Sequence, residues 1–288
     1  MKNTQKTGTL YVLIAAILFS IGGLCFKINP WPPLAINSAR NMISASIVFL
    51  FIRASKHKIR INKTVLIGAL CVTGTNNLYS LANKLTTAGN TIVLQFTAPI
   101  FIILLNALFF KIKPKKDDII ACVLVLVGIG FFVIDGLSAG NMLGNFLAIA
   151  SGLSYAGVFM LNSFEQSDSL SSVLAGQCMS ILIGLPFLLH VTEPTAIAIG
   201  AVLALGILQQ GSAFVLLTKG LETTPAITAS LITGIEPILN PLLVAVFYHE
   251  VLTPMSMVGA VIVFVTIILY NVQKGKQLPA DAGGGIHK

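Results

Sequence analysis

Charged residues are scarce in this 288-residue sequence. Only 10% of the residues are Asp, Glu, Lys or Arg, whereas 55% are hydrophobic, and the mean hydropathy is +0.90. Soluble domains carry about 25% charged residues, so this deficit excludes an ordinary soluble domain and indicates a membrane protein. The alternation of apolar and polar residues that is typical of membrane β-barrels is also missing. We therefore predict an all-α membrane protein.

The residues that most often perform catalysis or bind metals are few and scattered. The four cysteines all fall in apolar segments and form no CxxC pair, and the four histidines are far apart. The His249-Glu250 dipeptide lacks the second histidine, four residues after the first, that a zinc-protease helix requires. We therefore predict no catalytic site, no metal site and no cofactor, and hence a protein that is not an enzyme.

Long apolar segments fill the sequence instead. A membrane-spanning helix needs about 20 mostly apolar residues. Ten segments meet this requirement: 8–27, 33–53, 64–83, 89–110, 118–135, 142–164, 170–190, 195–217, 224–247 and 254–272. The connections between them are too short for a soluble domain. The first segment could also be a signal peptide, but Leu24 stands where a small residue should precede the cut, so we favour a retained first span.

The distribution of lysine and arginine predicts the orientation. With the N-terminus inside, fifteen of the eighteen basic residues fall on the cytoplasmic side, as the positive-inside rule requires. This asymmetry also accounts for the net charge of +8 without a nucleic-acid partner. We therefore predict a multi-pass protein of the inner membrane with both termini cytoplasmic and the lipid bilayer as its surroundings. The pattern is compatible with a monomer but does not determine the oligomeric state.

Two stretches of the sequence resemble each other. Residues 84–112 and 222–250 align at a constant offset of 138, which matches Thr86 with Thr224 and Pro99 with Pro237. We therefore divide the chain into a first repeat (1–138), a second repeat (139–272) and a disordered cytoplasmic tail (273–288). Each repeat holds five spans, and an odd number inserts the second copy upside down. Inverted repeats with broken helices are typical of secondary transporters.

The repeated pattern also resembles a known family. The pattern consists of a threonine, a small residue, an apolar run, a proline and then an acid, as in "TTPAITASLITGIEP" followed by "FYHEVL". It is similar to the EamA repeat of the drug/metabolite transporter superfamily. The resemblance covers residues 8–272 and implies ten helices and transport of a small molecule. Arg40 resembles an arginine found in many members. The first copy departs from the pattern, because Ile112 stands where the second copy has Glu250. No acid occurs in 8–27, so the proton antiport of the small four-helix multidrug members is not implied.

Polar side chains within the spans should face the interior of the bundle, because they are costly in lipid. Several recur three or four residues apart, which places them on one face of a helix. We predict that eight of them surround one central substrate site: Asn76, Asn77, Tyr79, Gln95, Tyr155, Asn162, Gln209 and Gln210. The alternative for each is a hydrogen bond that only joins helices. These are mainly amides, which suit a polar or zwitterionic solute better than a strongly charged one.

The ninth span combines an acid with two prolines. Pro237 and Pro241 each lack the N–H that a helix needs four residues after a carbonyl, so we predict kinks there and at the equivalent Pro99. Glu236 is costly at a helix centre if ionised and should therefore be protonated or paired. Arg40 is its natural partner, in which case the pair is structural. A protonated Glu236 would instead be a candidate proton carrier.

These observations predict a secondary transporter that moves small polar metabolites by alternating access. Amino acids or related amphipathic compounds, and export rather than uptake, are what the resemblance implies. The alternative within transport is an importer of a vitamin, nucleobase or nucleoside. A lipid-modifying protein would need a catalytic group of residues, which we do not find, and a non-transporting scaffold would not need a repeated kink or a polar interior.

Overall fold

The fold is all-α throughout the described part of the computed structural model, which comprises residues 2–86, 88–133, 141–192, 194–239, 242–243 and 254–277. The first repeat contains α1 (Lys2–Phe19), α2 (Gly22–Ile28), α3 (Pro33–Ala54), α4 (Lys63–Leu85), α5 (Ala88–Gln95), α6 (Ala98–Phe110) and α7 (Lys116–Val133). The second contains α8 (Met142–Phe159), α9 (Ser169–Leu189), α10 (Ala196–Ala204), the π-helix η1 (Leu205–Ser212), α11 (Ala213–Leu221), α12 (Ala226–Ile232), the 3₁₀-helix η2 (Thr233–Ile235) and α14 (Pro254–Gln277).

Six helices are long and apolar enough to cross a membrane by length and composition: Lys6–Phe26, Pro33–Ala54, Lys63–Leu85, Met142–Phe159, Ser169–Leu189 and Ala196–Leu221. Three shorter apolar helices are Ala98–Phe110, Ala226–Leu239 and Met257–Tyr270. Together with α5 and α7, these helices correspond to the ten spans predicted from the sequence. The last span extends farther than predicted, because α14 continues to Gln277; residues 278–288 lie outside the described part of the chain.

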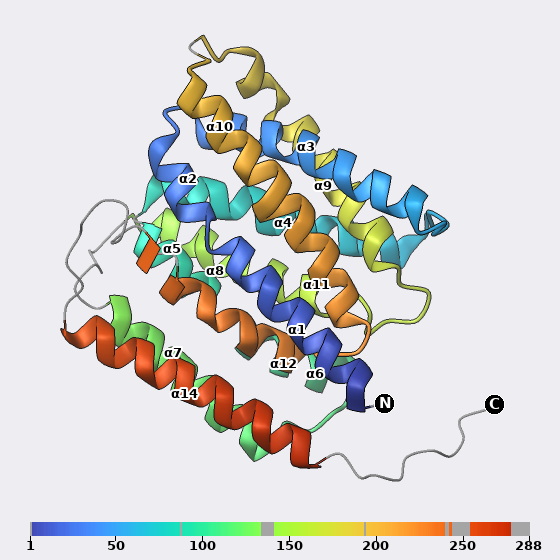
Figure 1. The fold of residues 1–288 in the computed structure, drawn as a ribbon, viewed down its shortest axis with the longest axis vertical. Helices are drawn as coiled ribbons and strands as arrows, with labels where there is room; N and C mark the ends of the chain where they lie inside the picture. Colours follow the sequence, from blue (N-terminus) through green and yellow to red (C-terminus); the bar gives the residue numbers. More distant parts are fainter. Residues whose placement is uncertain are drawn as a thin grey trace.

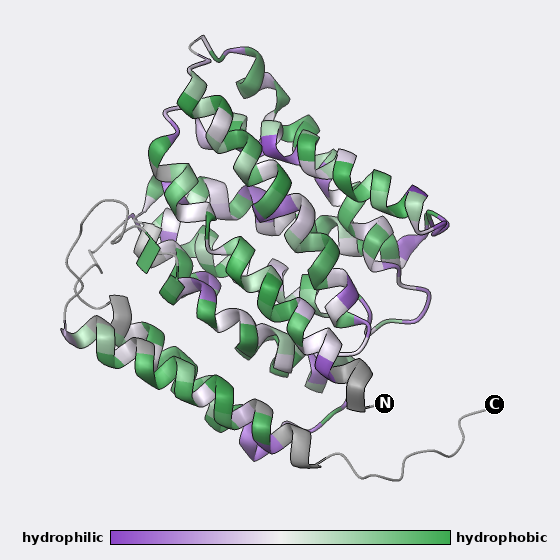
Figure 2. Cartoon of the chain, in the orientation of Figure 1, coloured by the Kyte–Doolittle hydropathy of each residue, from purple (hydrophilic) through white to green (hydrophobic). Residues whose placement is uncertain are grey.

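The outer surface of the bundle is apolar. Leu50, Leu182 and Leu269 are 65%, 69% and 62% exposed, and Figure 2 shows hydrophobic residues along the helices, with hydrophilic residues gathered mainly at the loops and inside the bundle. Soluble proteins rarely expose such continuous apolar surface. The chain is therefore a multi-pass membrane protein whose outer surface faces lipid.

The packing of the helices is symmetric between the two repeats. The second span of one repeat packs on the second span of the other (α3 on α9), and the fifth on the fifth (α7 on α14). The third span of each repeat packs on the first span of the other repeat, since α4 contacts α8 and α11 contacts α1. This reciprocity is what a pseudo-two-fold relation between two inverted five-helix repeats produces. Figure 1 shows α7 and α14 side by side along one edge of the bundle.

Helix starts are fixed by short polar side chains that accept a backbone N–H. Asn62 accepts from Val65 N, Asp168 from Ser171 N, and Thr195 from Ala198 N, so each satisfies one of the free donors of a helix N-terminus. These caps define where α4, α9 and α10 begin. Of these helices, α4 lines the cavity described below.

The prolines of the two repeats mark equivalent breaks. The fourth span is interrupted between Gln95 and Ala98, just before Pro99, and the ninth becomes a 3₁₀-helix at Thr233–Ile235, just before Pro237. At the offset of 138, residues 95–97 correspond to 233–235. A proline ring clashes with the carbonyl four residues earlier, which in these spans is that of Gln95 or Thr233. Pro241, Asn240 and Glu250 lie outside the described residues.

Candidate functional site

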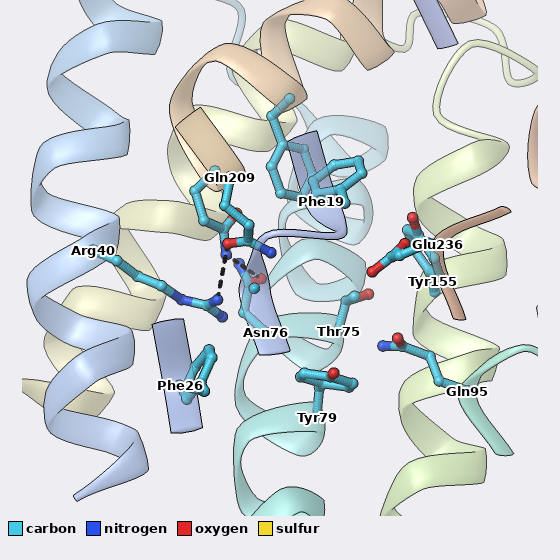
Figure 3. A pocket seen from close by; sticks show the side chains of 13 residues that line it. Phe19, Phe26, Arg40, Thr75, Asn76, Tyr79, Gln95, Tyr155, Gln209 and Glu236 are labelled. Atoms are coloured by element: carbon cyan, nitrogen blue, oxygen red, sulfur yellow. Dashed lines mark hydrogen bonds between the residues drawn. The ribbon is translucent and has the colours of Figure 1, made fainter. Parts of the chain in front are cut away.

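A cavity lies where the irregular parts of the helices meet (Figure 3). It is bordered by both repeats and lies beside the break between α1 and α2, η1, and the helical residues that follow η2. Its lining residues are Phe19, Gly22, Phe26, Arg40, Thr75, Asn76, Tyr79, Gln95, Tyr155, Gln209, Gln210, Phe214 and Glu236. Broken helices at membrane depth are tolerated where they line a cavity, and here the breaks and the cavity coincide.

The π-helix brings two adjacent glutamines to the same cavity. Gln209 and Gln210 both line it, and both belong to η1. Single turns of π-helix within α-helices are often found at functional sites. Gly22 makes room for this arrangement, because a Cβ there would lie 3.3 Å from Gln209 Nε2.

Arg40 enters the cavity from α3 and is held by neutral groups. Its Nε and Nη2 donate to Asn37 Oδ1 over 3.0 and 2.8 Å, and its Nη1 donates to Gln209 Oε1 over 3.1 Å. The guanidinium carbon also lies 4.9 Å from the centre of the Phe26 ring, a cation–π distance. The side chain is 2% exposed, so this charge is removed from water.

A second set of amides spans the repeats. Gln210 Nε2 of the second repeat donates to Asn76 Oδ1 of the first over 2.9 Å. Gln95 Nε2 of the first donates to Ser151 Oγ of the second over 2.7 Å. The polar lining is therefore built from both halves.

Glu236 and Arg40 face the cavity from opposite sides. In Figure 3, Arg40 and Phe26 lie on one side, Glu236, Tyr155 and Gln95 lie on the other, and Asn76 of α4 lies between them. The ion pair that we considered from the sequence is absent from this structure: among the described residues, Arg40 donates three hydrogen bonds to amide oxygens, and no salt bridge joins it to Glu236.

Six of the eight residues predicted to surround the site line this cavity: Asn76, Tyr79, Gln95, Tyr155, Gln209 and Gln210. Their contact with a substrate remains a prediction. These six residues belong to α4, α5, α8 and η1.

Asn77 and Asn162 do not line this cavity. Asn77 accepts from Asn37 Nδ2 over 3.0 Å and donates to Ser180 Oγ over 3.2 Å, so it joins α4 to α3 and α9. Adjacent residues of an α-helix point about 100° apart. Asn76 therefore faces the cavity, and Asn77 points toward α3 and α9. Asn162 lies beyond α8, which ends at Phe159, and accepts from Ser169 Oγ near one end of the bundle.

Several lining residues were not predicted from the sequence. Phenylalanines such as Phe19, Phe26 and Phe214 are common at lipid-facing and core positions, and nothing in their spacing indicates that they line a cavity. Thr75 lies off the face that Asn76 and Ser80 mark. The break between α1 and α2, at Ser20–Ile21, brings Phe19 and Phe26 to the cavity, and only the nearby Gly22 and Gly23 hint at it.

A second hollow lies near the ends of α3, α8 and α11. It is lined by His57, Arg60, Asn162, Ser167, Asp168, Ser169, Leu170, Thr218 and Glu222. Asp168 Oδ2 lies 2.6 Å from His57 Nε2 and 4.0 Å from Arg60 Nε. Within the described ranges, no group of three or more His, Cys, Asp or Glu side chains could hold a metal ion.

Known proteins resemble this chain in sequence and in fold. The chain is 27% identical over 287 residues to the uncharacterized transporter YwfM of Bacillus subtilis (strain 168). The alignment covers 95% of this chain and 97% of that protein. A solved crystal structure aligns with 95% of this chain and 100% of its own length, with a TM-score of 0.81 and 17% identity, and so has the same fold. The model of the EamA-like transporter family matches residues 6–134 and again residues 142–272. Since these two matches cover both repeats, the chain belongs to the EamA-like transporter family.

Proposed function

We propose that this protein is a secondary transporter that moves small polar metabolites across the inner membrane by alternating access. The observation that carries the proposal is the cavity between the two repeats, whose polar lining comes from both halves. Two inverted halves can exchange conformations, and a site between them then opens to each side in turn. Family membership supports transport rather than an enzymatic reaction.

The lining favours amphipathic solutes. Asn76, Gln95, Gln209 and Gln210 offer amide donors and acceptors, while Phe19, Phe26 and Phe214 offer apolar surface to the rest of the molecule. Amino acids or related amphipathic compounds have this combination. Export is the direction that the family resemblance implies, and cytoplasmic termini are the orientation that the lysines and arginines imply.

Transport can be tested in proteoliposomes. Purified protein would be reconstituted and supplied with a mixed pool of amino acids, vitamins, nucleobases and nucleosides, and the solutes that cross would be identified by mass spectrometry. We expect amino acids or their relatives to cross faster than in protein-free liposomes. A matched Gln210→Ala sample controls for leakage, because it should lower the specific flux while leaving the lipid and protein content unchanged. No difference from protein-free liposomes for any solute would reject the proposal.

The second candidate is an importer of a vitamin, nucleobase or nucleoside. The aromatic rings of Phe26 and Tyr79 on the cavity wall favour it, because planar heterocycles stack on such rings. The same proteoliposome pool separates the two candidates, since each contributes its own class of solutes.

A further inference from the structure

Arg40 carries a buried positive charge that the described residues do not neutralise. Among the described residues, its hydrogen bonds go to the neutral amide oxygens of Asn37 and Gln209, and the salt bridges involve other groups. A guanidinium has five N–H donors, and these bonds use three of them. A buried charge is costly unless it is paired, so the free protein holds this group in an incompletely satisfied state.

A purely structural role does not explain a charge at this position. Arg40 does connect α3 to η1 through Gln209, but a neutral amide makes the same kind of connection at lower cost, as Gln177 does when its Nε2 donates to Ser44 Oγ over 2.6 Å between α9 and α3. What a guanidinium adds is charge and a planar pair of donors that matches a carboxylate.

We propose that Arg40 is the anion anchor of the transport site and that the transported solute carries a carboxylate which binds its guanidinium. This inference rests on the proposed transport function and narrows its substrate class. Asn37 and Gln209 are positioning residues, since they hold the guanidinium from two sides, and the ring of Phe26 covers one face of it.

Hydrogen-bond acceptors elsewhere on the cavity wall offer the complementary chemistry. Gln210 Oε1 is buried and has no hydrogen-bond partner among the described residues, although the Nε2 of the same side chain is bonded to Asn76. Glu236 faces the cavity from the side opposite Arg40 (Figure 3). Both groups accept N–H bonds, so the lining suits a solute that carries an amino group as well as a carboxylate. Such a zwitterion has no net charge, which agrees with the predominance of amides in the lining.

Gln209→Glu tests the anchor with minimal change of shape. The new carboxylate would take the place of the amide oxygen 3.1 Å from Arg40 Nη1 and supply the missing counter-charge. We expect the ligand-free protein to be at least as stable as wild type in thermal unfolding, but to bind carboxylates more weakly. Gln210→Glu is the matched control, because it adds the same charge at the adjacent position, whose partner is Asn76, and should lower the stability.

The ligands would be L-leucine and L-phenylalanine, each paired with its carboxamide, together with uridine and thiamine as solutes that lack a carboxylate. Binding would be measured as the shift in unfolding midpoint of the purified full-length protein. We expect the free acids to bind at least about tenfold more tightly than their carboxamides, as a hydrogen bond to a charged group implies. Arg40→Gln should remove this preference and Arg40→Lys should keep part of it.

Three results would overturn the inference, and they differ in what they leave standing. Equal binding of acids and carboxamides, or binding of uridine or thiamine alone, rejects the anchor and leaves transport intact. An unchanged preference in Gln209→Glu shows that Arg40 acts in folding only. If no compound shifts the midpoint or crosses proteoliposomes, the anchor fails together with the proposed function.

Discussion

His57 Nε2 lies 2.6 Å from Asp168 Oδ2, and this contact joins the loop after α3 in the first repeat to the residue that caps α9 in the second. Two further bonds support it: Asn62 Nδ2 donates to the Gln166 carbonyl over 2.8 Å, and Arg60 N donates to Ser171 Oγ over 3.0 Å. Together they tie the two repeats at the end of the bundle where α1 begins. Under the proposed alternating-access mechanism, these ties must break for this end to open.

Asp168→Asn should therefore favour opening at this end. Asparagine keeps the capping oxygen for Ser171 N but removes the charge that attracts His57 and Arg60. We expect the reactivity of a cysteine placed at Thr218, in the adjoining hollow, to rise by about tenfold, the change that corresponds to losing one hydrogen bond to a charged group. The measurement uses a maleimide in a background without native cysteines. Glu222→Gln is the control, because its exposed bond to Lys219 contributes only about 0–1 kcal/mol. Equal reactivity in Asp168→Asn and wild type would argue against a tie.

The orientation of the protein in the membrane gives a second prediction. The loops after α3 and α6, the start of α1 and the end of α14 lie at the same end of the bundle (Figure 1), and the first two are rich in lysine and arginine. A cysteine at Lys58 should thus be protected from an impermeant maleimide in intact cells and labelled in inverted vesicles. Strong labelling in intact cells would reverse the assigned orientation.

Close packing of α3 on α9 depends on a glycine. A Cβ at Gly184 would lie 2.4 Å from the Leu34 carbonyl oxygen and 2.8 Å from Ser38 Cβ. Because the first of these is backbone, the helices must move apart, and Gly184→Ala should lower the free energy of unfolding by about 1–3 kcal/mol. At Gly200 a Cβ meets nothing within 4 Å, so Gly200→Ala should be neutral or stabilising by about 0.5–1 kcal/mol. Thermal unfolding in detergent compares the two, and equal midpoints would refute the predicted contact.

The amides of α4 and η1 should separate into two groups in function. Gln210→Ala removes a residue of the cavity wall and should reduce transport without reducing expression. Asn77→Ala removes the bonds to Asn37 and Ser180 that join three helices, and should lower stability by about 1–3 kcal/mol, the cost of leaving a buried partner unsatisfied. Transport rates per folded molecule, with unfolding midpoints measured in parallel, distinguish these effects. If Gln210→Ala transports at the wild-type rate, this amide only joins helices.

The sequence predicted the architecture well because the two strongest signals are long-range and redundant. Apolar length located the ten spans, and the aligned Pro99 and Pro237 located the break in each repeat. Positions that depend on the axial rotation of a single helix were harder to predict. Asn76 and Asn77 are adjacent in the sequence, and only the packing of α4 between α3, α8 and α9 determines which one faces the cavity.

Local irregularities were beyond what periodicity can predict. A π-helix at Leu205–Ser212 brings both Gln209 and Gln210 to the cavity, whereas an α-helix would turn them farther apart. The break after Phe19 changes the direction of the first span without a proline. Each depends on how neighbouring helices pack, which the sequence of one span does not encode. The expected ion pair of Arg40 with Glu236 is missing for a similar reason. Both side chains line the same cavity, but the guanidinium is hydrogen-bonded to Asn37 and Gln209 instead.

Glu236→Gln is the decisive change for the mechanism of coupling. Glutamine keeps the shape of the side chain and removes the group that can gain or lose a proton. Because Arg40 is bonded to Asn37 and Gln209 and not to Glu236, we expect the single variant to unfold within about 1 kcal/mol of wild type, well below the 3–5 kcal/mol that breaking a buried ion pair costs. For the same reason, Arg40→Met combined with Glu236→Gln should show no rescue, and the two effects on stability should add.

If Glu236 carries protons, the Glu236→Gln variant should still bind substrate, but its transport in proteoliposomes should no longer respond to an imposed pH gradient. A strongly destabilised single variant that the double change rescues would establish the ion pair in another conformation of the transport cycle. A variant with wild-type stability and an undiminished response to the gradient would show that Glu236 serves neither purpose.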